Sequence, residues 1–238
     1  MKAAFISDIH GNAFALEAVL EDIAKKQIDQ IYVLGDLCFR GPNPKQALDL
    51  IRSLNANVIK GNADEWVVRG IQKGEVPDEA LDVMKKEREW TVDHLDSADI
   101  DYLQNLPQTL QIDLNGKAIL AFHATPNSLF DIIRPDTDDV HLEKRLMAEN
   151  MADFYIYGHI HLPYIRFLNG KTVLNIGSVG LPFDGQAMAS YGIVEAEDGN
   201  VRVSIERVNY DIEKTVQQYM ENDYPNKAMV DVVRNGRL

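Results

Sequence analysis

The N-terminal quarter of the chain alternates short apolar runs with amphipathic stretches. The apolar runs predict buried strands over Lys2–Ser7, Gln30–Leu34 and Asn57–Lys60. The stretches between them predict a helix from Asn12, which can cap it, to about Gln27, and a second helix over Pro44–Leu54. Strand–helix–strand order with short links favours parallel strands joined by right-handed crossovers.

The alternation of predicted strands and helices stops after the third predicted strand. Residues 65–106 are rich in charge, contain Gly70, Gly74 and Pro77, and then predict a long helix around Glu79–Leu95. We interpret this stretch as a helical insertion that resembles a cap.

The second half of the chain is dominated by strand and hairpin patterns. Turn signals stand at Asn115-Gly116, Asn169-Gly170 and Asp198-Gly199. Strands are expected at Thr109–Asp113, Lys117–Phe122, Phe154–Tyr157, Tyr164–Leu168, Thr172–Ile176, Ser190–Glu195 and Val201–Val208. Helices are expected at Val140–Asn150 and at Tyr210–Glu221, where we expect the ordered part to end.

Together these elements predict an α/β fold. We expect a four-layer α/β/β/α sandwich of two mixed sheets flanked by helices, built as a single domain over residues 1–238 with its helical insertion at about 65–106.

Composition narrows the class of protein. No apolar stretch reaches the ~18 residues of a membrane span, and the first residues lack a signal peptide's apolar core. One cysteine, Cys38, allows no internal disulfide, so we expect a cytoplasmic protein and an inert, buried thiol. A net charge of −13 argues against binding of a nucleic-acid backbone. A homo-oligomer is left open.

Polar side chains follow each of the first three predicted strands. Asp8 and His10 follow the first, Asp36 the second and Asn62 the third. Because loops at the carboxyl ends of parallel strands converge, we expect these four residues to form one site. The alternative for Asp8, as a cap of the following helix, is the more ordinary interpretation of that residue by itself.

Histidine gives the sharper signal. His10 and His123 each end a predicted strand, and His159 and His161 follow another in the sequence Gly158-His-Ile-His. An isolated histidine is usually structural or exposed, which is our interpretation of His94 and His141 in their charge-rich helices. Four at strand ends, beside two aspartates and an asparagine, predict a site for two divalent cations. Mixed nitrogen and oxygen ligands favour Mn, Fe or Zn.

These motifs resemble those of the calcineurin-like metallophosphoesterases, and the chain looks like the small bacterial phosphodiesterases among them. The resemblance covers Met1 to about Gly185 and rests on motifs in the family's order and spacing. They are Asp8-x-His10, Gly35-Asp36, Gly61-Asn62, His123 and Gly158-His159-x-His161, followed by Asn175-Ile-Gly-Ser-Val-Gly-Leu-Pro.

The resemblance implies a ligand set and an activity. One metal would be held by Asp8, His10, Asp36 and His161, and the other by Asp36, Asn62, His123 and His159. Asp36 would bridge them, and Asp36, Asn62 and His123 would be catalytic. The implied reaction is hydrolysis of a phosphate ester by a metal-bridging hydroxide, with a small ester or a nucleotide as substrate and a phosphodiester as the preferred class. The alternatives are a protein serine/threonine phosphatase, a hydrolase of dinucleoside polyphosphates, and a scaffold that binds proteins without catalysis.

Two positions qualify this interpretation. Where the family usually has Gly-Asn-His, this chain has Gly61-Asn62-Ala63, so the imidazole that helps the leaving group depart is missing and activated aryl esters should be favoured. Arg40, in a segment similar to Gly-Asp…Arg-Gly of the serine/threonine phosphatases, is expected to bind substrate together with Asn62. An exposed arginine in a turn is the equal alternative for Arg40.

Overall fold

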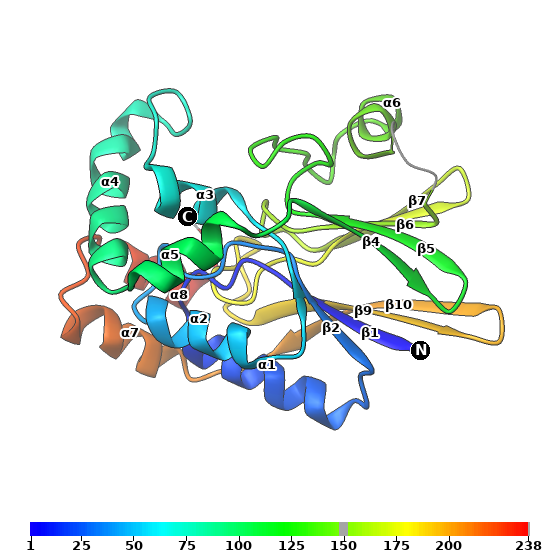
Figure 1. Ribbon diagram of the computed structural model, residues 1–238, viewed down its shortest axis with the longest axis horizontal. Coiled ribbons are helices and arrows are strands. Elements are labelled where there is room, and N and C mark those ends of the chain that lie inside the picture. The colour runs from blue at the N-terminus through cyan, green and yellow to red at the C-terminus, as the bar shows by residue number, and fades with distance from the viewer. Residues whose placement is uncertain (148–151, 238) are drawn as a thin grey trace.

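The computed structural model describes residues 1–147 and 152–237, and its two sheets face each other (Figure 1). The first sheet has the strand order β10-β9-β1-β2-β3, and the second has the order β4-β5-β6-β8-β7. The strands are β1 (Lys2–Ile6), β2 (Gln30–Val33), β3 (Asn57–Val58), β4 (Thr109–Leu114), β5 (Lys117–Phe122), β6 (Phe154–Tyr157), β7 (Tyr164–Leu168), β8 (Lys171–Asn175), β9 (Ala189–Glu197) and β10 (Asn200–Val208). The helices are α1 (Ala13–Lys25), α2 (Pro44–Ser53), α3 (Asn62–Arg69), α4 (Asp78–Asp93), α5 (Ser97–Gln104), α6 (Asp139–Leu142), the π-helical turn η1 (Glu143–Met147), α7 (Ile212–Glu221) and α8 (Met229–Asn235).

Both sheets are mixed, as the sequence predicts. Strand β1 pairs parallel with β2 and antiparallel with β9, while β6 pairs parallel with both β5 and β8. The hairpins β4–β5 and β7–β8 turn at Asn115-Gly116 and Asn169-Gly170, where all four residues have positive φ. Tight hairpin turns of this hand require that conformation, which is why asparagine and glycine mark them.

The side chains of β1 show how the layers form. Ala3 and Phe5 are buried between the sheets, in a core shared with Ile119 and Ile156 of the second sheet. Ala4 and Ile6 face the opposite way, into the core under α1 and α2. A third core lies between the second sheet and the segment that carries α6 and η1, above that sheet in Figure 1. The predicted α/β/β/α sandwich is therefore confirmed.

The prediction that the ordered part ends with α7 is wrong. Helix α8 follows it and buries Met229, Val232 and Val233 against Tyr219 and Tyr224. The predicted helix over Val140–Asn150 is present as α6 and η1, and residues 148–151 lie outside the described part of the chain.

Helices α3, α4 and α5 occupy the stretch that we interpreted as an insertion. Helix α4 reaches the C-terminal segment, where the ring of Trp90 meets that of Tyr224 at 4.8 Å between centroids. Its role as a cap stays a prediction. Among the described helices, none is both long and apolar enough to cross a bilayer.

Candidate metal centre

All seven predicted ligands come together at one edge of the sandwich. Asp8 and His10 lie in the β1–α1 loop, Asp36 in the β2–α2 loop, and Asn62 at the first turn of α3. The second sheet contributes the other three residues, His123 after β5 and His159 and His161 after β6.

The first group of ligand atoms belongs to Asp8, His10, Asp36 and His161. All four side chains are buried, and one ligand atom from each lies within 4.8 Å of the others. The Nε2 atom of His161 is 3.1 Å from Asp8 Oδ1 and 3.1 Å from Nε2 of His10. This is the set that the family resemblance implies for one metal.

The second group surrounds the side-chain oxygen of Asn62. Asn62 Oδ1 is 2.9 Å from Nε2 of His123 and 2.8 Å from Nδ1 of His159. Asp36 reaches both groups, because its Oδ2 lies 3.4 Å from His123 Nε2 and 3.6 Å from His10 Nε2. Of the two carboxylates among the seven residues, Asp36 is therefore the one whose oxygen lies near imidazole nitrogens of both groups.

Backbone carbonyls fix the orientation of three imidazoles. Nδ1 of His10 is 2.8 Å from the carbonyl of Phe39, Nδ1 of His123 is 2.7 Å from that of Leu34, and Nδ1 of His161 contacts that of Leu181. A carbonyl only accepts, so each Nδ1 carries the proton and donates. In the neutral ring each Nε2 then keeps its lone pair for a cation, which is how metal-binding histidines are commonly held.

One carboxylate oxygen buried in the candidate site has no hydrogen-bond partner among the described residues. Asp8 is fully buried, and its Oδ2 accepts from the backbone N–H of His159 at 2.9 Å, whereas its Oδ1 accepts from none of their donors. An ionised oxygen left in this way is costly unless a cation compensates it. The residues present therefore fit a metal ion in the first group.

The backbone around the ligands is strained in a consistent way. Asp8, His10, Asp36, His159 and His161 all have φ between 48° and 67°, in the left-handed region. Non-glycine residues adopt this region rarely, and such strain collects at functional sites. The loops therefore hold these side chains in positions that a relaxed strand end would not give.

Comparison with known proteins then decides the family. The description "Calcineurin-like phosphoesterase superfamily domain" matches residues 1–199. The chain belongs to this superfamily.

Relatives share much of the chain. An uncharacterized protein of Methanocaldococcus jannaschii is 33% identical, with 93% of each chain covered. Phosphodiesterase YfcE of Escherichia coli is 28% identical over 82% of this chain and 88% of its own. A symmetrical bis(5'-nucleosyl)-tetraphosphatase of Baumannia cicadellinicola is 32% identical over 52% of this chain, which spans 42% of that enzyme. The crystal structure of a metallophosphoesterase from Sphaerobacter thermophilus has a TM-score of 0.80 at 27% identity, with 99% of each chain covered.

The glycines of the superfamily motifs in this chain are explained by close approach. A Cβ on Gly61 would lie 2.1 Å from Asp36 Oδ1, and one on Gly158 would lie 2.4 Å from Asp8 Oδ2 and 2.3 Å from Ser7 Oγ. Real Cβ atoms do not approach other heavy atoms so closely, so each glycine makes room for the carboxylate of a predicted ligand.

Burial and neighbouring charges shift the pKa values of the groups at this phosphoesterase site. Burial lowers the pKa of His10 and of His159 to about 4. Burial also lowers the pKa of His123, but the carboxylates of Asp36 and Asp8 outweigh it and raise that pKa to about 9. For Asp36, burial raises the pKa, and His123 and His10 more than reverse this. His10 and His159 are thus neutral at pH 7, the form that binds metal.

Asp64 is a part of the site that sequence reasoning missed. Its carboxylate accepts from the backbone N–H of Asp36 at 2.8 Å, of Leu37 at 2.9 Å and of Gly61 at 2.9 Å. Burial and the charge of Asp36 raise the pKa of Asp64 to about 7. Asp64 thereby ties the loop of Asp36 to the start of α3. Its place three residues after Gly61, where an acid can bond back to the helix start, is the signal that could have found it.

Ala63 does not line the open site. Its side chain is 1% exposed and packs in the core beneath α1 and α2, while its backbone N–H donates to Asp36 Oδ1 at 2.8 Å. The imidazole that is missing here therefore could not be restored by a larger side chain without disturbing the core.

Arg40 lies against the C-terminal helices. Its Nη2 contacts Met229 Sδ at 3.3 Å, and its Nε lies 3.7 Å from Oε2 of the buried Glu87. A contact of Arg40 with substrate stays a prediction.

The remaining predictions concern residues outside the ligand set. Asn12 caps α1, accepting from the N–H of Ala15 at 3.1 Å. Cys38 is buried, and burial raises the pKa of its thiol well above the ordinary value. His94 and His141 are exposed, as expected.

Proposed function

We propose that this protein is a phosphodiesterase that uses two divalent cations. The observation that carries the proposal is the convergence of two ligand groups on Asp36, together with the unpartnered Oδ1 of the buried Asp8. Asp8, His10, Asp36 and His161 would hold one cation, and Asp36, Asn62, His123 and His159 the other. When bound, such a pair lowers the pKa of water and draws charge from a phosphoryl oxygen.

The protein's own side chains and backbone position the groups that would take part in this reaction. Asp36 is kept between the two ligand groups by two hydrogen bonds. The N–H of Ala63 donates to one of its carboxylate oxygens, and its own backbone N–H donates to the carboxylate of Asp64. Asn62 can turn its oxygen to a cation and offer its NH2 to a phosphate oxygen. His123 would offer its Nε2 to a cation, because its Nδ1 donates to the backbone carbonyl of Leu34.

The donor set favours particular metals. Four imidazole nitrogens with carboxylate and amide oxygens suit Mn, Fe or Zn, since Mg and Ca prefer oxygen alone. We also propose a cytoplasmic location, supported by a single, buried cysteine.

The test is hydrolysis of bis(p-nitrophenyl) phosphate by the purified protein, first treated with chelator and then given Mn, Fe(II), Zn or Mg. We expect activity to return with Mn, Fe(II) or Zn, and metal analysis to give two ions per chain. Asp36→Asn should abolish hydrolysis and lower the metal content, whereas Asp49→Asn, an exposed change on α2, should alter neither. Full activity without added or bound metal would overturn the proposal.

If the protein were a scaffold without catalysis, it would not hydrolyse bis(p-nitrophenyl) phosphate with any metal. A scaffold of this fold has no need of buried ligand groups, yet all seven side chains converge in this chain. A preference for phosphoserine peptides over diesters would favour the protein phosphatase alternative instead.

A further inference from the structure

A pocket of about 450 Å³ opens beside the candidate metal centre. It is lined by Ile132, Arg134, His159, Ile160, Leu162, Phe183 and Arg237. His159 belongs to the second ligand group as well, so a substrate whose phosphate lies at that group has this pocket next to it. The volume falls in the range of small-molecule sites, about 300–1,000 Å³.

One wall of the pocket is apolar and flat. The ring of Phe183 stacks on that of His161, with centroids 4.3 Å apart and planes 22° from parallel, and is itself half-buried. Ile132 leaves 63% of its surface exposed, so its apolar side chain is open to a ligand in this pocket. Such a wall fits a planar ring of low polarity.

The other feature of the pocket is positive charge. Among the described residues, the guanidinium groups of Arg134 and Arg237 form no ion pair and no hydrogen bond, and both line this pocket. Every other arginine except Arg88 is paired with a carboxylate. Arg88 donates to backbone carbonyls, and Arg40 also contacts a methionine sulfur atom. In a chain of net charge −13, two free arginines in one pocket mark it for an anion.

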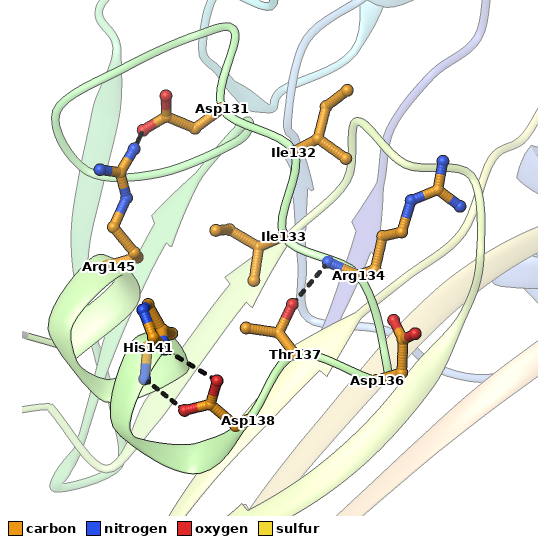
Figure 2. Close-up of a pocket in the computed structure, with 9 residues that line it drawn as sticks. All are labelled: Asp131, Ile132, Ile133, Arg134, Asp136, Thr137, Asp138, His141 and Arg145. Carbon is orange, nitrogen blue, oxygen red and sulfur yellow. Dashed lines mark hydrogen bonds and ion pairs between the residues drawn. The ribbon is translucent and has the colours of Figure 1, made fainter.

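The neighbouring hollow shows the contrast. It has a volume of about 740 Å³ and shares Ile132 and Arg134 with the pocket. Two of its aspartates are paired, Asp131 with Arg145 and Asp138 with His141 (Figure 2), while Asp136 has no ion pair among the described residues. Figure 2 also shows Arg134 extending away from the Asp138–His141 pair. This hollow is lined by three aspartates and two arginines, so it does not favour an anion. The pocket beside the metal centre is lined by Arg134 and Arg237 and, among the described residues, by no carboxylate.

We infer that the pocket binds the part of the substrate that is not attacked, and that this part carries a planar ring and at least one further phosphate group. The substrate class is thus a nucleotide-type ester with more than one phosphate. One phosphate would lie at the metal centre, the ring against Phe183, and the additional phosphate at Arg134 and Arg237. The inference rests on the proposed phosphodiesterase function for the position of the first phosphate only.

Binding tests the inference without any turnover. The full-length protein, loaded with Mn, is titrated with adenosine diphosphate, inorganic phosphate and adenosine in a calorimeter. We expect the diphosphate to bind at least tenfold more tightly than either of the others. Arg237→Gln and Arg134→Gln should each weaken diphosphate binding about tenfold, as expected for loss of a hydrogen bond to a charged group, and change phosphate binding far less. Arg202→Gln, on the 82%-exposed side chain of β10, is the matched control and should change nothing.

The outcomes separate this inference from the proposed function. Equal affinity for diphosphate and phosphate, or affinity that is indifferent to both arginine changes, overturns the inference even if bis(p-nitrophenyl) phosphate is hydrolysed. Arginine-dependent binding of the diphosphate supports it even if no ester is hydrolysed with any metal, in which case the proposed function fails alone. With an active enzyme, the ratio of kcat/KM for diadenosine tetraphosphate to that for bis(p-nitrophenyl) phosphate should fall about tenfold in Arg237→Gln.

Discussion

Glu87 of α4 and Arg40 of the β2–α2 loop form an ion pair inside the protein, with 3.7 Å between Oε2 and Nε. The Glu87 side chain is fully buried, and its other oxygen accepts from Tyr224 at 3.2 Å and Asn226 at 3.1 Å. Burial raises the pKa of Glu87, and Arg40 opposes that effect. Glu87 thus links α4 to the β2–α2 loop and to the segment after α7. Arg40 lies only four residues after the candidate bridging ligand, Asp36.

We predict that Glu87→Ala destabilises the protein by about 3 kcal/mol, because it leaves the Arg40 charge partly buried without a partner. Thermal and urea unfolding would measure the change. Glu89→Ala, on an exposed position of the same helix, should cost less than about 0.5 kcal/mol. Equal stability of the two variants would show that the pair contributes nothing.

Metal removal should lower the melting temperature of wild-type protein. A ligand that binds only the folded state stabilises it by about 4 kcal/mol at a thousand times its Kd. Asp36→Asn and His161→Ala should therefore melt near the temperature of the chelator-treated wild type and show no hydrolysis, while circular dichroism stays native. Variants that melt far below the metal-free wild type would mean that these side chains stabilise the fold by themselves.

Gly158→Ala should reduce metal affinity and stability together. The new methyl group would lie within 2.4 Å of Asp8 Oδ2, so either that ligand or the loop must move. We expect a loss of about 2–4 kcal/mol, at the upper end of overpacking effects. Gly199→Ala is the reference, since no atom lies within 4 Å of the added methyl and only positive φ opposes it, at about 1 kcal/mol. If the two variants bind metal equally well, the close approach at Gly158 does not position Asp8.

Wild-type kcat should depend steeply on the pKa of the leaving group, since no imidazole follows Asn62 to supply a proton. A series of substituted aryl phosphodiesters measures this slope, and a flat series would mean that another acid acts. Ala63→His should leave the dependence of kcat on the leaving-group pKa as steep as in the wild type. Because Ala63 is packed in the core, we expect the variant to lose about 1–3 kcal/mol of stability. Faster cleavage of alkyl esters with an unchanged melting temperature would contradict this expectation.

The sequence predicted those parts of the protein that depend on local pattern. Buried strands, the Asn12 cap and ligands at strand ends follow from periodicity and from the convergence of loops, and the structure places them together. The sequence alone could not predict features that depend on contacts between residues far apart in the chain. Helix α8 is short, so it depends on tertiary contacts such as those with Tyr219 and Tyr224. Arg134 and Arg237 are 103 positions apart, and neither has a neighbour in the sequence that marks it as part of a pocket.

The division of the ligands between the two sheets has a consequence for assembly. Asp8 and His161 are separated by 153 positions and belong to different sheets, yet their side chains meet at 3.1 Å. A growing chain has no complete ligand group until the segment that carries His159 and His161 has left the ribosome and the second sheet has docked on the first. A cation held there would then fasten the sheets at one edge, so that metal uptake during refolding would report docking of the two halves and not the formation of any single helix or strand.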